Sequence, residues 1–189
     1  VALSGADRSV LWQHPSSDGR ESAAAASIGD FDGDGDLDVF SSVIQGVFPM
    51  WGGSEARAFD GRTGEILFED DVPLQLIIGA TLAADVDGDG KDEVLLARTA
   101  IASEPEEPEW SELQILHVDE GRFEVIGELE GMVGSAGWVG DADGDGYLEW
   151  YLTLNSRDVS RLVRYDLPGR VPNRIAWGGY LGTRHDGRY

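Results

Sequence analysis

The sequence predicts an all-β protein assembled from repeated units of four strands, and three observations support this expectation. A nine-residue acidic loop occurs three times in the 189-residue chain, at intervals of 55 and 56 residues. Short runs of β-branched and aromatic residues flank each loop, as is typical of strands. No stretch has the apolar spacing of an amphipathic helix.

The acidic loops occupy residues 30–38, 85–93 and 141–149. Each has acids at positions 1, 3, 5 and 9, glycines at positions 4 and 6, and a variable residue at position 7. Loop by loop, the candidate metal ligands are Asp30, Asp32, Asp34, Asp36 and Asp38; Asp85, Asp87, Asp89, Lys91 and Glu93; and Asp141, Asp143, Asp145, Tyr147 and Glu149.

Loops with this composition have the chemistry of a calcium site. Calcium takes about six to eight oxygen ligands in flexible geometry, and aspartates at positions 1, 3 and 5 place three carboxylates on one concave side of a tight turn. Glycine at position 6 allows a positive φ. Position 7 is Asp36, Lys91 or Tyr147, so we expect its backbone carbonyl, not its side chain, to bind. The sequence therefore predicts three structural calcium ions, one per loop.

Other interpretations of the loops fit less well. An EF-hand needs a glutamate at position 12 and a helix on each side, but position 12 is Ser41, Leu96 or Leu152 and strand-like residues follow. Tandem nine-residue calcium repeats are adjacent, whereas these loops are separated by a whole repeat. Three acidic turns without a metal would leave clustered carboxylates that repel one another.

The motif DxDGDGxx[DE], preceded by a strand of small and apolar residues, resembles the FG-GAP or VCBS repeats. The preceding strands are residues 26–29, 82–84 and 137–140. The resemblance covers nearly the whole chain and implies a β-propeller with calcium in the hairpin loop between the first two strands of each blade. Integrin α-subunit propellers and many secreted bacterial proteins belong to this family. The expected fold is thus a β-propeller segment with three four-stranded blades plus half of a preceding blade.

Residues 1–13 are expected to form the outer hairpin of the preceding blade. They match residues 58–68 at an offset of 56, where Leu3 corresponds to Phe59. Because the chain thus opens halfway through a blade, we interpret it as the C-terminal part of a longer polypeptide. Closed propellers have about four to eight blades, so three and a half would leave sheet edges open to further blades on the same or another chain.

The first full blade is expected at residues 24–70, after a polar connector at 14–23 in which His14 is solvated. Its elements are, in order, a first strand at 24–29, the acidic loop, a second strand ending at Ile44, a loop at 45–55 that holds Phe48 and Trp51, and a hairpin around Asp60 and Gly61.

The second and third blades repeat this plan over residues 76–130 and 132–177. The second has a first strand at 77–84, an exposed insertion at 102–112 that holds Trp110, and outer strands at 113–118 and 123–129. The third has strands at 137–140, 150–154, 161–165 and 174–177. Residues 178–189 resemble the closing segment of some secreted bacterial propellers, and the alternative is that they start another blade.

Composition narrows the classes of partner. A net charge of −22 argues against nucleic acid and anionic membranes. The chain has no cysteine and therefore no disulfide. It has no apolar run of the roughly 18 residues that a membrane-spanning helix needs, and no visible signal peptide.

The leading hypothesis for function is a calcium-stabilised scaffold for protein or carbohydrate interaction or adhesion. It would act outside the cell, at the cell surface or in the periplasm, and would not be an enzyme. One alternative is a non-catalytic or substrate-positioning part of a polysaccharide-acting or quinoprotein-like enzyme, and another is a purely architectural segment of a larger assembly. The three histidines, His14, His117 and His185, form no evident catalytic constellation, and His117 is expected to be structural.

A protein or glycan partner is expected on the face opposite the calcium loops. Connections in a propeller alternate between two faces, so the loops between second and third strands lie away from the acidic loops. Aromatic residues on those loops, namely Phe48, Trp51 and Trp110, are the candidate contacts. The alternative for Phe48 and Trp51 is that they fold back and cap their own blade.

Overall fold

The computed structural model of the chain describes residues 1–15, 20–21, 24–47, 50–101, 109–134, 137–156, 159–170 and 175–179, with the side chains of residues 20 and 21 excepted. These residues form strands and turns and no helix, which confirms the all-β expectation. They accordingly include no helix long and apolar enough to cross a membrane. Phe48, His185 and nearly all of the expected closing segment at 178–189 lie outside the described residues.

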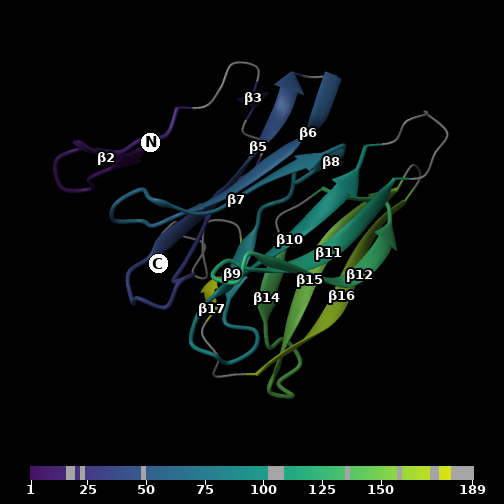
Figure 1. Cartoon of the computed structure of the whole chain (residues 1–189). Helices are drawn as coiled ribbons and strands as arrows, with labels where there is room; N and C mark the ends of the chain where they lie inside the picture. Colours follow the sequence, from purple (N-terminus) through teal and green to yellow (C-terminus); the bar gives the residue numbers. More distant parts are fainter. Residues whose placement is uncertain are drawn as a thin grey trace.

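Three antiparallel sheets and one small hairpin make up the described structure (Figure 1). The hairpin pairs β1 (Ala2–Leu3) with β2 (Val10–Trp12). The first sheet contains β3 (Arg20–Glu21), β4 (Ser27–Gly29), β5 (Asp38–Val47), β6 (Met50–Phe59) and β7 (Ile66–Pro73). The second contains β8 (Gln75–Leu76), β9 (Leu82–Ala84), β10 (Glu93–Ala100), β11 (Trp110–His117) and β12 (Arg122–Glu130). The third contains β13 (Met132–Val133), β14 (Trp138–Gly140), β15 (Tyr147–Ser156) and β16 (Val159–Arg170).

Each sheet follows one plan, in which the first strand is split into two short pieces. β3 and β4 both pair with β5, β8 and β9 both pair with β10, and β13 and β14 both pair with β15. The first strands expected at 24–29 and 77–84 are therefore too long. The reason is visible in the second sheet, where buried Ile77 leaves the ladder and its amide donates to Ser54 Oγ of the first sheet.

Two apolar layers hold the three sheets face to face. One layer lies between the first and second sheets and includes Phe40, Val94 and Leu96. The other lies between the second and third sheets and includes Leu95 and Trp150. Successive side chains of a strand point to opposite faces, so β10 contributes to both layers. This double burial explains why β10 has a nearly continuous apolar sequence.

The β1–β2 turn is a structural copy of the β6–β7 turn. In both turns, the first residue exchanges backbone hydrogen bonds with the residues four and five positions later: Ser4 with Arg8 and Ser9, and Asp60 with Gly64 and Glu65. Arg8 and Gly64 also share a positive φ, at 63° and 75°. The copies are 56 residues apart, so the backbone repeats with the period that the sequence match predicts.

The β1–β2 hairpin docks on the first sheet through aromatic rings. Trp12 Nε1 donates to Gly61 O at 2.8 Å, and the indole stacks on Phe59 with ring centroids 5.5 Å apart. His14 lies 4.8 Å from Phe59 between ring centroids, and its Nε2 is 2.6 Å from Gly64 O. The expectation that His14 is solvated is therefore wrong. Gly64 leaves the necessary room, because a Cβ there would lie 2.6 Å from the Trp12 ring.

Three connections differ from their expected form, and one is the exposed insertion expected at 102–112, whose residues 110–112 belong to β11 with Ser111 buried. The loop expected at 45–55 is the end of a long hairpin, because β5 and β6 stay paired as far as Val47 and Met50. A register shift at Gly46, whose φ is 94°, lets this ladder continue. The connector expected at 14–23 contributes β3, since β5 extends beyond β4 and offers backbone groups that need partners.

β17 (Ile175–Trp177) does not pair with the third sheet as its expected fourth strand. It pairs antiparallel with β9 of the second sheet, with Ile175 opposite Ala84. Ala176 and Trp177 are buried in the layer between the first and second sheets, which favours this position for a large aromatic side chain. Within the described residues, the strands do not close into a barrel or a ring.

Candidate metal sites in the three acidic loops

The three acidic loops occupy equivalent places in the three sheets. They connect β4 to β5, β9 to β10 and β14 to β15, and they lie at the same end of the stacked sheets (Figure 1). The glycines at positions 4 and 6 have φ between 78° and 94° in every loop. Other residues resist this conformation, so the glycines allow the backbone to curl around the acids.

One pattern of four hydrogen bonds recurs in all three loops. The amide at position 4 donates to the carboxylate at position 1, and the amide at position 5 donates to the carboxylate at position 3. The amide at position 7 donates to the carboxylate at position 5, and the amide at position 2 donates to the carboxylate at position 9. In the first loop these bonds measure 2.8, 3.0, 2.8 and 2.8 Å. In the second they measure 2.7, 3.1, 2.8 and 2.8 Å, and in the third 2.7, 3.2, 2.9 and 2.7 Å. Each of these carboxylates is thus oriented by at least one backbone amide, and Asp38 and Asp141 also accept through the second oxygen, from the Gly61 and Gly146 amides at 3.2 Å.

The oriented acids of each loop come together. In the third loop, one oxygen from each of four acids lies within 4.8 Å of the others: Asp141, Asp143, Asp145 and Glu149. The corresponding groups of three are Asp30, Asp32 and Asp38 in the first loop, and Asp85, Asp87 and Asp89 in the second. All donors in these groups are carboxylate oxygens, the ligands that a hard divalent cation prefers.

Position 7 differs from the acidic positions of the loops in its side-chain contacts. All three side chains have partners outside the acid groups: Asp36 lies 3.4 Å from Arg62 Nε, Lys91 pairs with Asp119, and Tyr147 has the Arg170 guanidinium 4.4 Å from its ring centroid. Among the described residues, the Asp36 carboxylate belongs to none of the groups of acids and histidines that could hold a metal. Their carbonyl groups are the remaining candidate ligands.

The acids at position 9 of the three loops are buried. Burial raises the pKa of Asp38 to about 6, and the charges of Asp32 and Asp60 act in the same direction. Burial raises the pKa of Glu93 to about 8, with the neighbouring loop aspartates adding to the shift. Glu149 is buried too, and its Oε1 accepts no hydrogen bond from the described residues. A cation within each loop would offset these costs of burying carboxylates.

The third strand of each sheet, or the turn directly after it, supplies a residue that the sequence pattern did not reveal. The ladder pairs Asp166 with Glu149, while Asp60 and His117 directly follow the partners of Val39 and Val94, the residues after the position 9 acids. Asp60 joins a group with Asp32 and Asp34, and His117 joins one with Asp87 and Glu93. The chain separation between position 9 and this residue differs in every sheet, so the repeat spacing gave no signal for it.

The third loop contains a cation of the protein itself. Arg164 on β16 places Nη1 2.6 Å from Asp143 Oδ2 and Nη2 3.5 Å from Glu149 Oε1. Its Nε also lies 2.6 Å from Asp166 Oδ1. The hydrogen bond from Arg164 lowers the pKa of Asp143. The guanidinium therefore neutralises part of the charge that a metal ion would meet in this loop.

The first and second loops are joined directly. The Asp92 amide donates to Asp30 O at 2.9 Å, and Asp92 Oδ2 accepts the Asp30 amide at 2.9 Å. Asp92 is buried and holds position 8, where the other loops have Leu37 and Leu148. Because Asp30 is a candidate ligand, the arrangement of the first loop depends on the second.

The candidate partner residues have different surroundings. Phe48 lies outside the described residues. Trp51 is on β6 and is half-buried, whereas Trp110 begins β11 with 48% of its surface exposed. Trp110 is therefore the aromatic residue that a partner can reach more easily.

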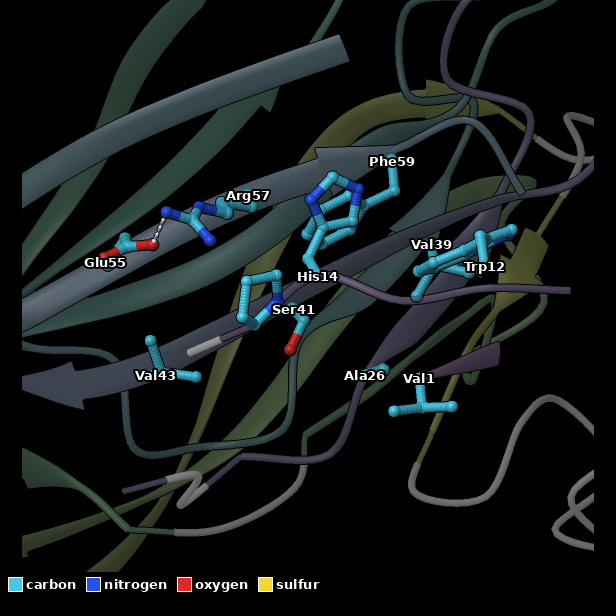
Figure 2. Close-up of a pocket in the computed structure, with 11 residues that line it drawn as sticks. Val1, Trp12, His14, Ala26, Val39, Ser41, Val43, Glu55, Arg57 and Phe59 are labelled. Atoms are coloured by element: carbon cyan, nitrogen blue, oxygen red, sulfur yellow. Dashed lines mark ion pairs between the residues drawn. The ribbon is translucent and has the colours of Figure 1, made fainter. Parts of the chain in front are cut away.

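A pocket of about 460 Å³ lies where the β1–β2 hairpin meets the first sheet (Figure 2). Figure 2 shows the His14 ring beside Phe59, and the ion pair between Glu55 and Arg57 on the same side of the pocket. Arg57 also binds Glu69 at 2.7 Å. Arg57 thus pairs with two carboxylates, and the three groups together keep one negative charge.

Comparisons with known proteins give distant likenesses. No protein-family model matches the chain, and no curated protein matches it significantly. Among solved structures, rhamnogalacturonan lyase YesW matches at 15% identity and a TM-score of 0.46, over 77% of this chain and 34% of that one. The exotype rhamnogalacturonan lyase YesX matches at 16% identity and a TM-score of 0.45, over 77% of this chain and 33% of that one. The chain spans about a third of these lyase chains. Likenesses at this level carry no argument about function, and they do not test the resemblance to FG-GAP or VCBS repeats.

Proposed function

We propose that the chain is a calcium-binding β scaffold of the FG-GAP or VCBS propeller type, in which each acidic loop holds one structural calcium ion. The observation that supports this most strongly is the recurrence of one hydrogen-bond pattern in three loops, with acids at positions 1, 3, 5 and 9 oriented in the same way. Calcium would tie the first strand of each sheet to the second.

A calcium-dependent melting experiment tests this proposal. Extracellular calcium modules bind at about 10⁻⁴–10⁻³ M, so calcium at about 100 times the dissociation constant would stabilise the fold by roughly 2.7 kcal/mol per site. For a chain of this size that corresponds to a rise in Tm of about 5–10 °C. Asp32→Asn keeps the oxygen that accepts the Asp34 amide but removes the charge. It should lower Tm in calcium and leave Tm in chelator almost unchanged.

The matched control is Glu128→Gln, which removes the same charge from an exposed position on β12. It should leave the calcium-dependent rise in Tm intact. Equal destabilisation of Asp32→Asn in calcium and in chelator would refute a metal-binding role for the first loop.

We further propose that the scaffold binds a protein or glycan, outside the cytoplasm, at the end of the sheets away from the acidic loops. Exposed apolar side chains at that end support this: Val47, Met50, Leu74, Trp110 and Val159, with exposed fractions from 48% to 78%. They flank the β5–β6, β7–β8, β10–β11 and β15–β16 connections. Exposed apolar side chains that gather at one end of a molecule can form an interaction site.

Substitution of Trp110 tests the partner surface. Trp110→Ala should reduce binding to protein or glycan arrays at least severalfold while leaving Tm nearly unchanged, because half of the side chain is already exposed. Leu162→Ala is the control, since Leu162 is 72% exposed on β16. Array binding that is the same for both variants and the unmodified chain would contradict this surface.

A further inference from the structure

His117 differs from its counterparts beside the other two acidic loops. It ends β11 and is 93% buried, with 7% of its surface exposed. Its Nδ1 lies 3.7 Å from Glu93 Oε1 and 3.9 Å from Asp87 Oδ2. One ligand atom from each of these three side chains lies within 4.8 Å of the others. The second loop thus has a compact group that contains nitrogen, whereas Asp60 and Asp166 offer oxygen at the equivalent positions.

One nitrogen of the imidazole is buried without a hydrogen-bond partner. Nε2 accepts or donates no hydrogen bond among the described residues and is inaccessible to solvent. Glu124 Oε2 lies 3.6 Å from Nε2, beyond hydrogen-bond distance. Burying a polar group unsatisfied is costly. A metal bound at Nδ1 would place the proton on Nε2, facing Glu124, in the carboxylate–histidine–metal arrangement common in metal sites.

The ligand geometry suits a small tetrahedral ion. Two ligands of a tetrahedral zinc ion, each about 2.0–2.2 Å from the metal, are about 3.3–3.5 Å apart. The pairs from His117 to Glu93 and Asp87 would close by roughly 0.5 Å to reach this separation. Glu93 is buried, which fixes one ligand, while Asp87 is 45% exposed at its side chain and opens the group to solvent. An ion could therefore enter past the exposed Asp87 and bind the two buried side chains, Glu93 and His117.

We propose that Asp87, Glu93 and His117 form a mixed nitrogen and oxygen site that binds zinc or a similar divalent transition metal. Imidazole favours such ions over calcium. Asp87 also belongs to the oxygen-only group with Asp85 and Asp89, and Glu93 is the position 9 candidate ligand for calcium, so the two kinds of ion would share two carboxylates of the second loop. The site goes beyond the calcium proposal, because its ligand set does not require calcium in any loop.

Zinc titration of the full chain by calorimetry tests the site, first in metal-free buffer and then in calcium. The unmodified chain should bind one zinc ion more tightly than any other. His117→Asp places at this position the residue found at positions 60 and 166. The affinity for that zinc ion should fall at least tenfold in this variant, while calcium still binds. His14→Gln is the control, since it removes a histidine that lies outside the acidic loops.

A second variant keeps the test decisive if His117→Asp does not fold. Glu124→Gln changes a half-exposed residue on β12, and it should weaken zinc binding by about 10-fold or more, as loss of such partners usually does. Glu128→Gln on the same strand should have no effect. Equal zinc affinity in the unmodified chain and in the variants that fold would overturn the site. Zinc binding without calcium binding would instead defeat the calcium proposal alone.

Discussion

Arg164 gives the third loop a property that the other two loops lack. Its guanidinium contacts Asp143 and lies 3.5 Å from Glu149, both of which are candidate calcium ligands. A cation already within the group repels a metal ion and occupies carboxylate oxygens that the ion would use. The third loop should therefore bind calcium more weakly than its four clustered acids alone would suggest.

Replacing Arg164 should strengthen calcium binding. In Arg164→Gln, the positive charge is lost and Asp143 becomes available, so the calcium affinity of the third loop should rise severalfold, measured by calorimetry. Arg161→Gln is the matched control, because Arg161 is an exposed arginine on the same strand. Unchanged or weaker calcium binding in Arg164→Gln would show that the guanidinium helps to arrange the acids and does not compete with the metal.

The contrast between Asp143 and Arg164 shows what could be predicted at single positions. The acids of each loop are separated by fixed numbers of residues, and the hydrogen bonds that orient them are local, so sequence spacing was sufficient to find them. Arg164 and His117 come from the third strand of their sheets, and their approach depends on the register of a ladder. Because the lengths of chain before that strand differ between the sheets, no fixed spacing predicts these contacts.

The strand pairings in the middle of each sheet were predictable from the sequence, whereas the short strands at the edges of the sheets were not. β10 carries a strand-like run that directly follows an acidic loop, so its place was evident from the sequence. β3 and β8 are two-residue pieces held by backbone pairing to an overhanging neighbour, and such pairing has no side-chain signature. β17 was assigned by its order in the chain to the third sheet, whereas burial of Trp177 favours the second.

The form of the β1–β2 hairpin was predictable because its sequence is repeated elsewhere in the chain. Its own sequence is short and exposed, and alone it would give a weak indication of structure. The match with residues 58–68 predicted its form, and the turn hydrogen bonds of Ser4 and Asp60 follow the same pattern. Its docking through Trp12 and His14 was not predicted, because it depends on space left by a glycine in another turn.

For the molecule as a whole, the second sheet is the centre on which the described structure depends. Its two faces pack against the first and third sheets, and β17 extends its edge. Asp92 also joins the second acidic loop to the first. A cation in the second loop would therefore stabilise a sheet that contacts both neighbours, so the metal sites and the stacking of the sheets are physically coupled.

The number of calcium ions bound at saturation is the most direct test of whether each acidic loop binds one calcium ion. It can be measured by equilibrium dialysis of the full chain in zinc-free buffer, with a triple variant in which Asp32, Asp87 and Asp143 are each replaced by asparagine. We expect three calcium ions per chain for the unmodified protein and a marked loss in the triple variant, since each substitution removes a position 3 carboxylate. No bound calcium in the unmodified chain, or the same number in both, would contradict it.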